Sequence, residues 1–231
     1  MTLISSAATH PGRKRSRNED RLVARPDLGL WAVADGAGGH GAGDVASAAI
    51  ADALMAIPPG LSAAEMLAQL RLRLSAVNAE LRHRALDRGG IIASTVVVLL
   101  LRGDHYAALW AGDSRIYLLR QGAMHRVTHD HSLVQEMVDA GTLAAEDAEA
   151  HPQSNIITRA IGAEVDLVLD KVADRLLPGD RFLLCSDGVF KELAEAEIAG
   201  LVAAGSEAEE IVRRAVEAGG RDNVTVVVVG N

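Results

Sequence analysis

The sequence is poor in cysteine and has no long apolar run. Cys185 is its only cysteine, which excludes an internal disulfide and a cysteine-based zinc finger and is compatible with a reducing compartment. The longest apolar run has about eleven residues, too few to span a bilayer. The short apolar stretch at the N-terminus precedes a basic cluster, the reverse of the order in a secretory signal. We therefore expect a soluble, cytoplasmic protein that does not associate with membranes.

Basic residues are also in deficit. The sequence has 23 Lys and Arg residues and 31 Asp and Glu residues, which gives a net charge of -8. Its one basic cluster, residues 13–17, is short. This balance argues against general nucleic-acid binding, so we expect no nucleic-acid partner. An acidic protein that acts on phosphate must neutralise charge locally, with bound cations or with a few arginines.

The chain has no Pro- or Ser-rich linker, no low-complexity tract and no internal repeat. About half of its residues, 49%, are hydrophobic, which is enough for a sizeable core at a length of 231 residues. We therefore predict a single domain over residues 1–231.

Periodicity and turn residues predict a mixture of strands and helices. Ser62 and Glu65, and again Ser206 and Glu209, have the spacing of a helix capping box. The short connections between residues 93 and 127 favour an antiparallel meander. The expected strands are 2–9, 22–25, 30–34, 93–101, 105–111, 115–120, 123–127, 166–172, 180–185 and 224–229, and the expected helices begin at 45 and cover 63–87, part of 133–138, 195–203 and 206–218.

The apolar run 30–34 ends in Asp35, and a loop with almost no side chains follows. Gly36, Gly38 and Gly41 match the Gly-x-Gly-x-x-Gly pattern of dinucleotide-binding proteins. We reject that interpretation because Asp35 would place a negative charge beside a pyrophosphate, and because two helical patterns precede the next strand. A carboxylate followed by exposed backbone oxygens suits a hard divalent cation better.

Other acids stand in the same context, at the ends of apolar strands far apart in the chain. If packed sheets bring these strand ends together, five carboxylates share one pocket, and they cannot all stay ionised without cations. Each acid alone is typical of a turn, but the shared context predicts divalent metals bound by oxygen. The acids are Glu19, Asp35, Asp113, Asp187 and Asp222.

Two other hydrolase classes fit less well. A cysteine phosphatase needs Cys-x5-Arg, whereas the residue six positions after Cys185 is Lys191, so Cys185 is better explained as a buried strand residue. A zinc hydrolase built on His129 and His131 would need further ligands, and no histidine cluster lies nearby in the sequence.

A series of motifs, from about Arg13 to the C-terminus, resembles the metal-dependent protein serine/threonine phosphatases, the PPM or PP2C-type family. Each motif alone has little specificity, but eight in this order are specific. They are Arg15-x-x-Asn18-Glu19-Asp20, Asp35-Gly36-Ala37-Gly38-Gly39-His40, Ser94-Thr95, Gly112-Asp113-Ser114-Arg115, Thr128-His129-Asp130-His131-Ser132, Thr158-Arg159-Ala160-Ile161-Gly162, Ser186-Asp187-Gly188 and Asp222-Asn223.

The resemblance implies an α/β (α+β) sandwich of two packed, mainly antiparallel sheets flanked by helices on both sides. It also implies a centre of two Mn²⁺ or Mg²⁺ ions, with a possible third, and a bacterial flap at residues 131–157. By position, Asp35 would bridge two ions. The remaining assignments are Asp187 and Asp222 to the first ion, Glu19 and the Gly36 carbonyl to the second, Asp113 with Asp187 to the third, and Arg15 to the substrate phosphate.

The implied activity is hydrolysis of phosphoserine and phosphothreonine in proteins. Two cations roughly 3.5–4 Å apart lower the pKa of a shared water, so a bridging hydroxide attacks phosphorus directly. The leaving group would take its proton from His40 or from water on a third metal. His131 is a further candidate, although we interpret it chiefly as a support of the flap. The expected partners are phosphoproteins, and the enzyme would oppose a bacterial serine/threonine kinase. The rival is a silent phosphatase-like module that binds phosphoproteins, which predicts that one of the metal carboxylates is missing.

Overall fold

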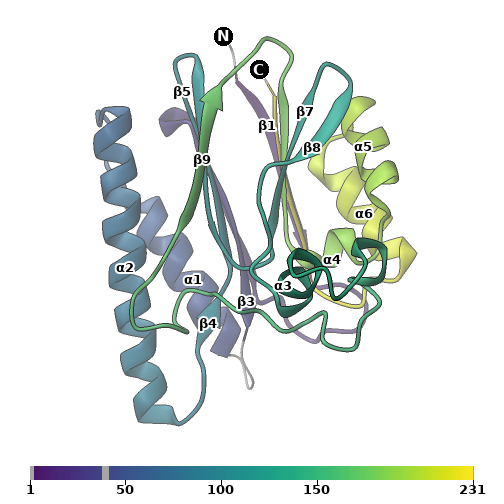
Figure 1. The fold of residues 1–231 in the computed structure, drawn as a ribbon. Coiled ribbons are helices and arrows are strands. Elements are labelled where there is room, and N and C mark those ends of the chain that lie inside the picture. The colour runs from purple at the N-terminus through teal and green to yellow at the C-terminus, as the bar shows by residue number, and fades with distance from the viewer. Residues whose placement is uncertain (1–2, 38–41, 231) are drawn as a thin grey trace.

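Two antiparallel β-sheets face each other in the computed structural model, which describes residues 3–37 and 42–230 (Figure 1). The first sheet has the order β1-β11-β10-β7-β8 and the second β2-β3-β5-β6-β9, with β4 paired to β3. The strands are β1 (Ile4–His10), β2 (Asp20–Arg25), β3 (Leu30–Ala37), β4 (Ala93–Ser94), β5 (Val96–Arg102), β6 (His105–Ala111), β7 (Arg115–Arg120), β8 (Ala123–Arg126), β9 (Asp170–Arg175), β10 (Arg181–Cys185) and β11 (Val224–Gly230).

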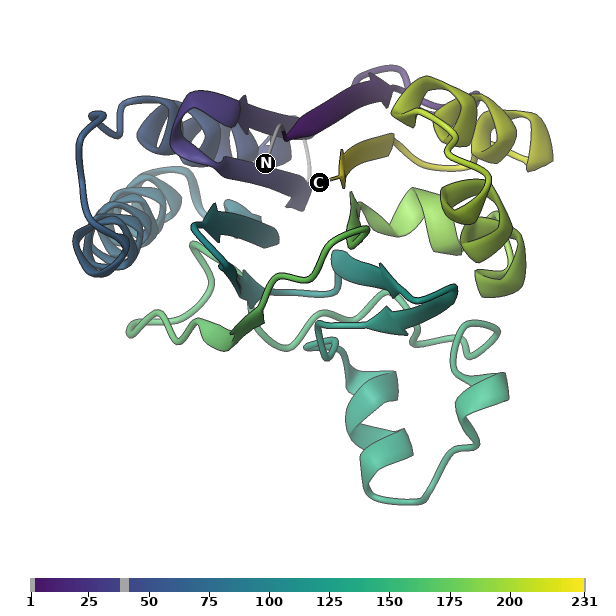
Figure 2. The same ribbon diagram turned by 90° about the horizontal axis from the view of Figure 1, so that it is seen from above.

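Helices cover the outer faces of both sheets (Figure 2). This arrangement confirms the predicted sandwich. The second sheet is covered by α1 (Ala42–Met55) and α2 (Ala63–Arg88), and the first by α4 (Asp187–Phe190), α5 (Glu195–Ala203) and α6 (Ala208–Ala218). Three short elements lie in connections: η1 (Pro26–Leu28), α3 (Leu133–Asp139) and η3 (Ala145–Asp147).

The hydrophobic core has three layers, one between the sheets and one beneath each set of helices. Trp31, Val97 and Phe182 are buried in the layer between the sheets. Burying a side chain of this size contributes about 1.5–3 kcal/mol, so this middle layer is a main source of cohesion between the sheets. Among the described residues, no helix is both long enough and apolar enough to cross a bilayer.

The α2 helix forms as the sequence predicts. The Ser62 hydroxyl accepts a hydrogen bond from the Glu65 amide, the Glu65 carboxylate accepts one from the Ser62 amide, and the capping box is complete. The stripe at spacings of three and four is buried, including Leu70, Leu74 and Leu81.

The second predicted capping box is wrong. The α6 helix begins at Ala208, and its N-cap residue Glu207 makes no side-chain capping bond. The Ala208 amide instead donates to the Ser6 hydroxyl of β1 at 2.8 Å. A tertiary contact therefore satisfies one of the first amides of α6, and the local capping box is not formed.

The antiparallel pairing predicted within residues 93–127 is confirmed for two hairpins, but the two do not form one continuous meander. Strands β5 and β6 pair in one sheet, β7 and β8 pair in the other, and the chain crosses between the sheets at residues 112–114. Gly112 makes the crossing with a φ of 111°, and a Cβ there would lie 2.5 Å from the Thr95 Cβ. The strand expected at 166–172 lies instead at Asp170–Arg175, because Val168 is 55% exposed and pairing with β6 begins at Asp170.

Candidate metal centre and phosphate site

A cavity of about 1090 Å³ opens where the strand ends of both sheets meet residues of the 131–157 flap. Its lining includes Arg15, Glu19, Asp35, Gly36, Asp187 and Asp222. The structure thus brings together six of the residues selected from sequence. Asp113 does not line the cavity, but it is buried and lies close enough for the charge of Asp187 to act on it.

Asp35 lies near the end of β3, where buried neighbours hold its backbone. The Thr95 amide donates to the Asp35 carbonyl at 2.9 Å, and the Asp35 amide donates to the Thr95 hydroxyl at 3.2 Å. The Ser94 hydroxyl donates to the same carbonyl at 2.9 Å. Burial, with the repulsion of Asp20 next, raises the pKa of Asp35 well above its usual value.

Asp20 is a buried acid of the site that the sequence analysis did not select. It is 1% exposed, and its Oδ2 accepts hydrogen bonds from the Ser186 hydroxyl at 2.8 Å and the Thr225 hydroxyl at 2.6 Å. Its other oxygen, Oδ1, has no hydrogen-bond partner. Burial raises the pKa of Asp20 to about 7. Its place just before the expected strand 22–25 was a signal in the sequence, but Glu19 shares that place, and only the register of β2 against β3 distinguishes the two.

Glu19, which the sequence analysis did select, precedes Asp20 and faces the cavity. Its amide donates to the Asn223 side-chain oxygen at 2.8 Å, and its carbonyl accepts from the Gly36 amide at 3.2 Å. Backbone packing is tight here, since a Cβ on Gly36 would lie 2.2 Å from the Gly43 carbonyl oxygen. Glycine at position 36 is therefore required by the close approach of two backbones.

Asp113 follows the crossing at Gly112 and is 5% exposed. Burial, with the repulsion of Asp187 next, raises the pKa of Asp113 to about 7. Its Oδ1 is buried without a hydrogen-bond partner, as is the Oδ1 of Asp187. Buried carboxylate oxygens that lack partners are costly, and a divalent cation is a group that such oxygens could bind.

Two cationic side chains contact the remaining acids. Arg15 donates from Nε to Oδ1 and from Nη2 to Oδ2 of Asp222, both at 2.8 Å, as a two-pronged pair. The Lys191 Nζ lies 2.6 Å from Oδ2 of Asp187. Sequence reasoning missed Lys191 in this role, although its spacing of four from Asp187 on a helix was a usable signal.

These contacts decide how the acids fit a metal. Within residues 3–37 and 42–230, no group of three or more His, Cys, Asp or Glu side chains is arranged to hold an ion as it stands. Asp187 and Asp222 are turned toward Lys191 and Arg15 instead. The donor set nevertheless suits a hard divalent cation, because four of its carboxylates line one cavity and the Oδ1 of one of them, Asp187, has no hydrogen-bond partner.

The sequence analysis named two histidines as candidate general acids, and the structure describes only one of them, His131. His40 lies outside the described residues. His131 is buried beside the crossing, where its Nδ1 accepts from the Gly112 amide at 3.1 Å and its Nε2 lies 3.1 Å from the Arg159 Nη1. Burial lowers the pKa of His131. His131 is not among the residues that line the cavity, and its contacts are those of a support for the crossing.

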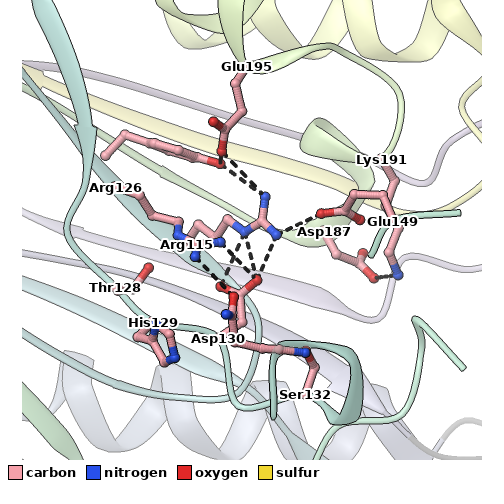
Figure 3. Close-up of polar contacts among 12 residues, drawn as sticks. Arg115, Arg126, Thr128, His129, Asp130, Ser132, Glu149, Asp187, Lys191 and Glu195 are labelled. Carbon is pink, nitrogen blue, oxygen red and sulfur yellow. Dashed lines mark hydrogen bonds and ion pairs between the residues drawn. The ribbon is translucent and has the colours of Figure 1, made fainter. Parts of the chain in front are cut away.

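A buried arginine connects the flap to the body of the protein (Figure 3). Arg115 donates from Nε and Nη2 to Oδ2 of Asp130 at 3.0 and 2.7 Å, and from Nη2 to Glu149 of the flap at 2.7 Å. Its guanidinium carbon lies 3.6 Å from the centre of the Phe190 ring. Glu149 also lines the cavity, so this cluster positions one wall of the site.

Comparison with known proteins gives a consistent result. The model of the family described as protein phosphatase 2C matches residues 10–222. The serine/threonine protein phosphatase PstP of Mycobacterium tuberculosis is 36% identical over 236 residues, which cover 99% of this chain but 45% of that protein. The chain thus spans about half the length of PstP. Protein phosphatase PhpP of Streptococcus pneumoniae is 37% identical over 240 residues, which cover 97% of this chain and 96% of PhpP.

Solved structures agree with these matches. The Pseudomonas aeruginosa protein PppA, described as a key regulatory component of T6SS, superimposes with a TM-score of 0.92 at 38% identity, covering 100% of this chain and 99% of PppA. The catalytic domain of PstP in complex with two manganese ions gives a TM-score of 0.86 at 33% identity, covering 99% of this chain and 97% of that domain. This chain therefore belongs to the protein phosphatase 2C family of serine/threonine protein phosphatases.

Proposed function

We propose that this chain hydrolyses phosphoserine and phosphothreonine in proteins and depends on Mn²⁺ or Mg²⁺ to do so. The observation that carries the proposal is the meeting of Asp35, Asp187 and Asp222, from strand ends far apart in the sequence, around one cavity that also contains an arginine. No carboxylate of the expected set is missing, as the rival phosphoprotein-binding module would require.

The ligands are assigned from the positions of these residues and from the family resemblance. Asp35, Asp187 and Asp222 would hold one ion, and Asp35, Glu19 and the Gly36 carbonyl a second. Asp113 and Asp187 are the pair available to a third. When bound, divalent cations of this kind activate water for attack on phosphorus and offset the charge of the phosphate. Asp20 lies next to this set without belonging to it. Its charge repels that of Asp35, and its Oδ2 accepts hydrogen bonds from Ser186 and Thr225.

Arg15 is the proposed phosphate ligand. A guanidinium presents two parallel N–H groups that match two phosphate oxygens, and it keeps its charge at any physiological pH. Those N–H groups are now directed at Asp222. The Arg15 side chain is 58% exposed, so it is free to turn from Asp222 toward an incoming phosphate.

The position of the flap at the cavity favours a phosphorylated protein as the substrate. Glu149, Ser154, Asn155 and Ile157 contribute to the cavity wall, so a phosphorylated peptide in the cavity would lie against them. The proposed partners are phosphoproteins and a serine/threonine kinase whose products this chain dephosphorylates. A cytoplasmic location and a single functional domain over residues 1–231, with the flap as an insertion, remain predictions of the sequence.

A peptide assay tests the proposal directly. The protein is incubated with a phosphothreonine peptide in Mn²⁺, in excess chelator, and as the variants Asp35→Asn and Asp187→Asn. With Mn²⁺ we expect phosphate release from the wild-type protein and from the control variant, and we expect none in chelator or from Asp35→Asn and Asp187→Asn. Asp104→Asn is the matched control, because Asp104 is an exposed acid at the turn between β5 and β6. Activity in the presence of chelator would contradict the mechanism, and binding of the peptide without turnover would favour the phosphoprotein-binding module.

A further inference from the structure

Among the described residues that line the cavity, Lys191 is the only lysine, and it contacts two different parts of the site. Its Nζ donates to Oδ2 of Asp187 at 2.6 Å and to the side-chain oxygen of Asn155 at 2.6 Å. Asp187 is an acid of the proposed metal centre, and Asn155 belongs to the flap. Figure 3 shows the Lys191 side chain directed at Asp187. One ammonium therefore joins the centre to the flap.

The surroundings of Lys191 explain why a positive charge is favourable there. Its side chain is 22% exposed and that of Asp187 is 14% exposed, so water screens the pair only in part. Asp113 and Asp35 also act electrostatically on Lys191. Asp187 and Asp113 each have a buried Oδ1 without a hydrogen-bond partner, and their mutual repulsion needs a cation to offset it.

We propose that Lys191 is a tethered counter-ion, which competes with a divalent cation for Asp187 and, through Asn155, couples the occupancy of the metal centre to the flap. The inference rests on the metal-dependent function proposed above. A divalent ion on Asp187 repels the ammonium, so the carboxylate cannot satisfy both at full strength. Lys191 is thus a positioning residue, since it acts through Asp187 and Asn155 rather than on the substrate.

Metal binding provides a test that does not require activity. Mn²⁺ is titrated calorimetrically into metal-free wild-type protein and the variants Lys191→Gln, Lys191→Arg and Lys171→Gln. We expect Lys191→Gln to bind Mn²⁺ about tenfold more tightly, because a like charge near the ion has been removed. Lys191→Arg, which keeps the charge, stays within about twofold of wild type. Lys171→Gln is the control for loss of one charge, because Lys171 is exposed on β9 and outside the cavity lining, and it also stays near wild type.

Hydrogen exchange at residues 153–157 tests the connection to the flap. In metal-free protein, Lys191→Gln and Asn155→Ala both speed exchange there, and Mn²⁺ speeds it in the wild-type protein. Asn155→Ala leaves the Lys191–Asp187 pair in place, so its Mn²⁺ affinity stays near that of the wild type. Circular dichroism establishes that each variant is folded.

The possible failures are distinguishable. If wild-type protein and variants bind no Mn²⁺, the metal centre fails and this inference fails with it. If all bind Mn²⁺ with equal affinity, or if exchange in the flap responds to neither the variants nor the ion, the role of Lys191 is refuted while the metal centre stands.

Discussion

Asp20 and Asp35 occupy facing positions in the antiparallel pair of β2 and β3. Side chains at facing positions lie on the same side of a sheet, and like charges there repel. This relationship explains why Asp20 is the largest electrostatic cause of the raised pKa of Asp35. The native fold of the metal-free protein therefore holds two acids together at a cost that a proton or a cation relieves.

The first prediction concerns pH. The pKa of Asp20 and of Asp113 is about 7 in the folded protein, against 3.8 for an unperturbed aspartate. Between these values the folded state binds more protons than the unfolded state, so the free energy of unfolding falls as pH rises from about 4 to about 7. We expect the melting temperature of metal-free protein to be at least about 3 °C lower at pH 8 than at pH 5.

Asp20→Asn is the control for this experiment, because it removes the titration and keeps an oxygen for Ser186 and Thr225. Its melting temperature should change less with pH than that of the wild-type protein. Added Mn²⁺ should raise the melting temperature more at pH 8 than at pH 5, since the ion competes with protons for the same oxygens. Identical pH profiles for the two proteins would contradict the assignment.

The second prediction concerns Arg15. Arg15→Ala should raise the KM for a phosphothreonine peptide about tenfold or more, because a charge-assisted contact with the phosphate is lost. Arg15→Lys should recover only part of the loss, since an ammonium cannot form the two-pronged contact. Steady-state kinetics at saturating Mn²⁺ measures both variants. Arg213→Ala is the control, because Arg213 forms exposed pairs on α6. An unchanged KM for Arg15→Ala would remove Arg15 from the phosphate site.

The third prediction concerns the crossing between the sheets. Gly112→Ala places a Cβ 2.5 Å from Thr95 at a φ of 111°, and should lower the free energy of unfolding by about 2–4 kcal/mol. Gly122→Ala is the matched control, since Gly122 has a φ of 81° but nothing within 4 Å of the new Cβ. It should cost about 1 kcal/mol. Urea unfolding compares the two, and equal losses would show that the contact with Thr95 is relieved at no cost.

The fourth prediction concerns the Arg115 cluster. Asp130→Ala leaves the buried guanidinium without its main partner and should lower the free energy of unfolding by about 3–5 kcal/mol. Glu149→Gln should cost less than about 1 kcal/mol, because the Glu149 side chain is 45% exposed and water screens its pair with Arg115. Urea unfolding at constant pH measures both. A larger loss for Glu149→Gln than for Asp130→Ala would reverse the proposed order of importance within the cluster.

The sandwich was predicted from the resemblance to the PP2C-type family. The long helix α2 and most of the acids that meet at the cavity were predicted from local signals, a capping box at Ser62 and carboxylates where apolar runs stop. Asp20 is the acid that the sequence analysis missed. Its neighbour Glu19 is only half-buried, and the register of β2 against β3 places Asp20 inside, opposite Asp35.

What the sequence could not predict depends on contacts between distant segments. The capping of α6 by Ser6 and the crossing between sheets at Gly112 both arise from tertiary packing. The same holds for Lys191, whose partner Asn155 lies 36 residues away in the flap. Pattern analysis assigns each residue to an element, but it does not say which side of which sheet the next element joins.

The Asp20 carboxylate joins the two sheets, because Asp20 lies on β2 while Thr225 lies on β11 of the opposite sheet. In the middle of the sandwich the sheets adhere through apolar side chains such as Trp31 and Phe182, which do not respond to ions or protons. The contacts between the sheets thus differ along the sandwich. The middle layer is apolar, whereas the contact at Asp20 depends on a group that binds protons. A change in the protonation of Asp20 therefore alters a contact between the sheets beside the cavity and leaves the apolar layer unchanged.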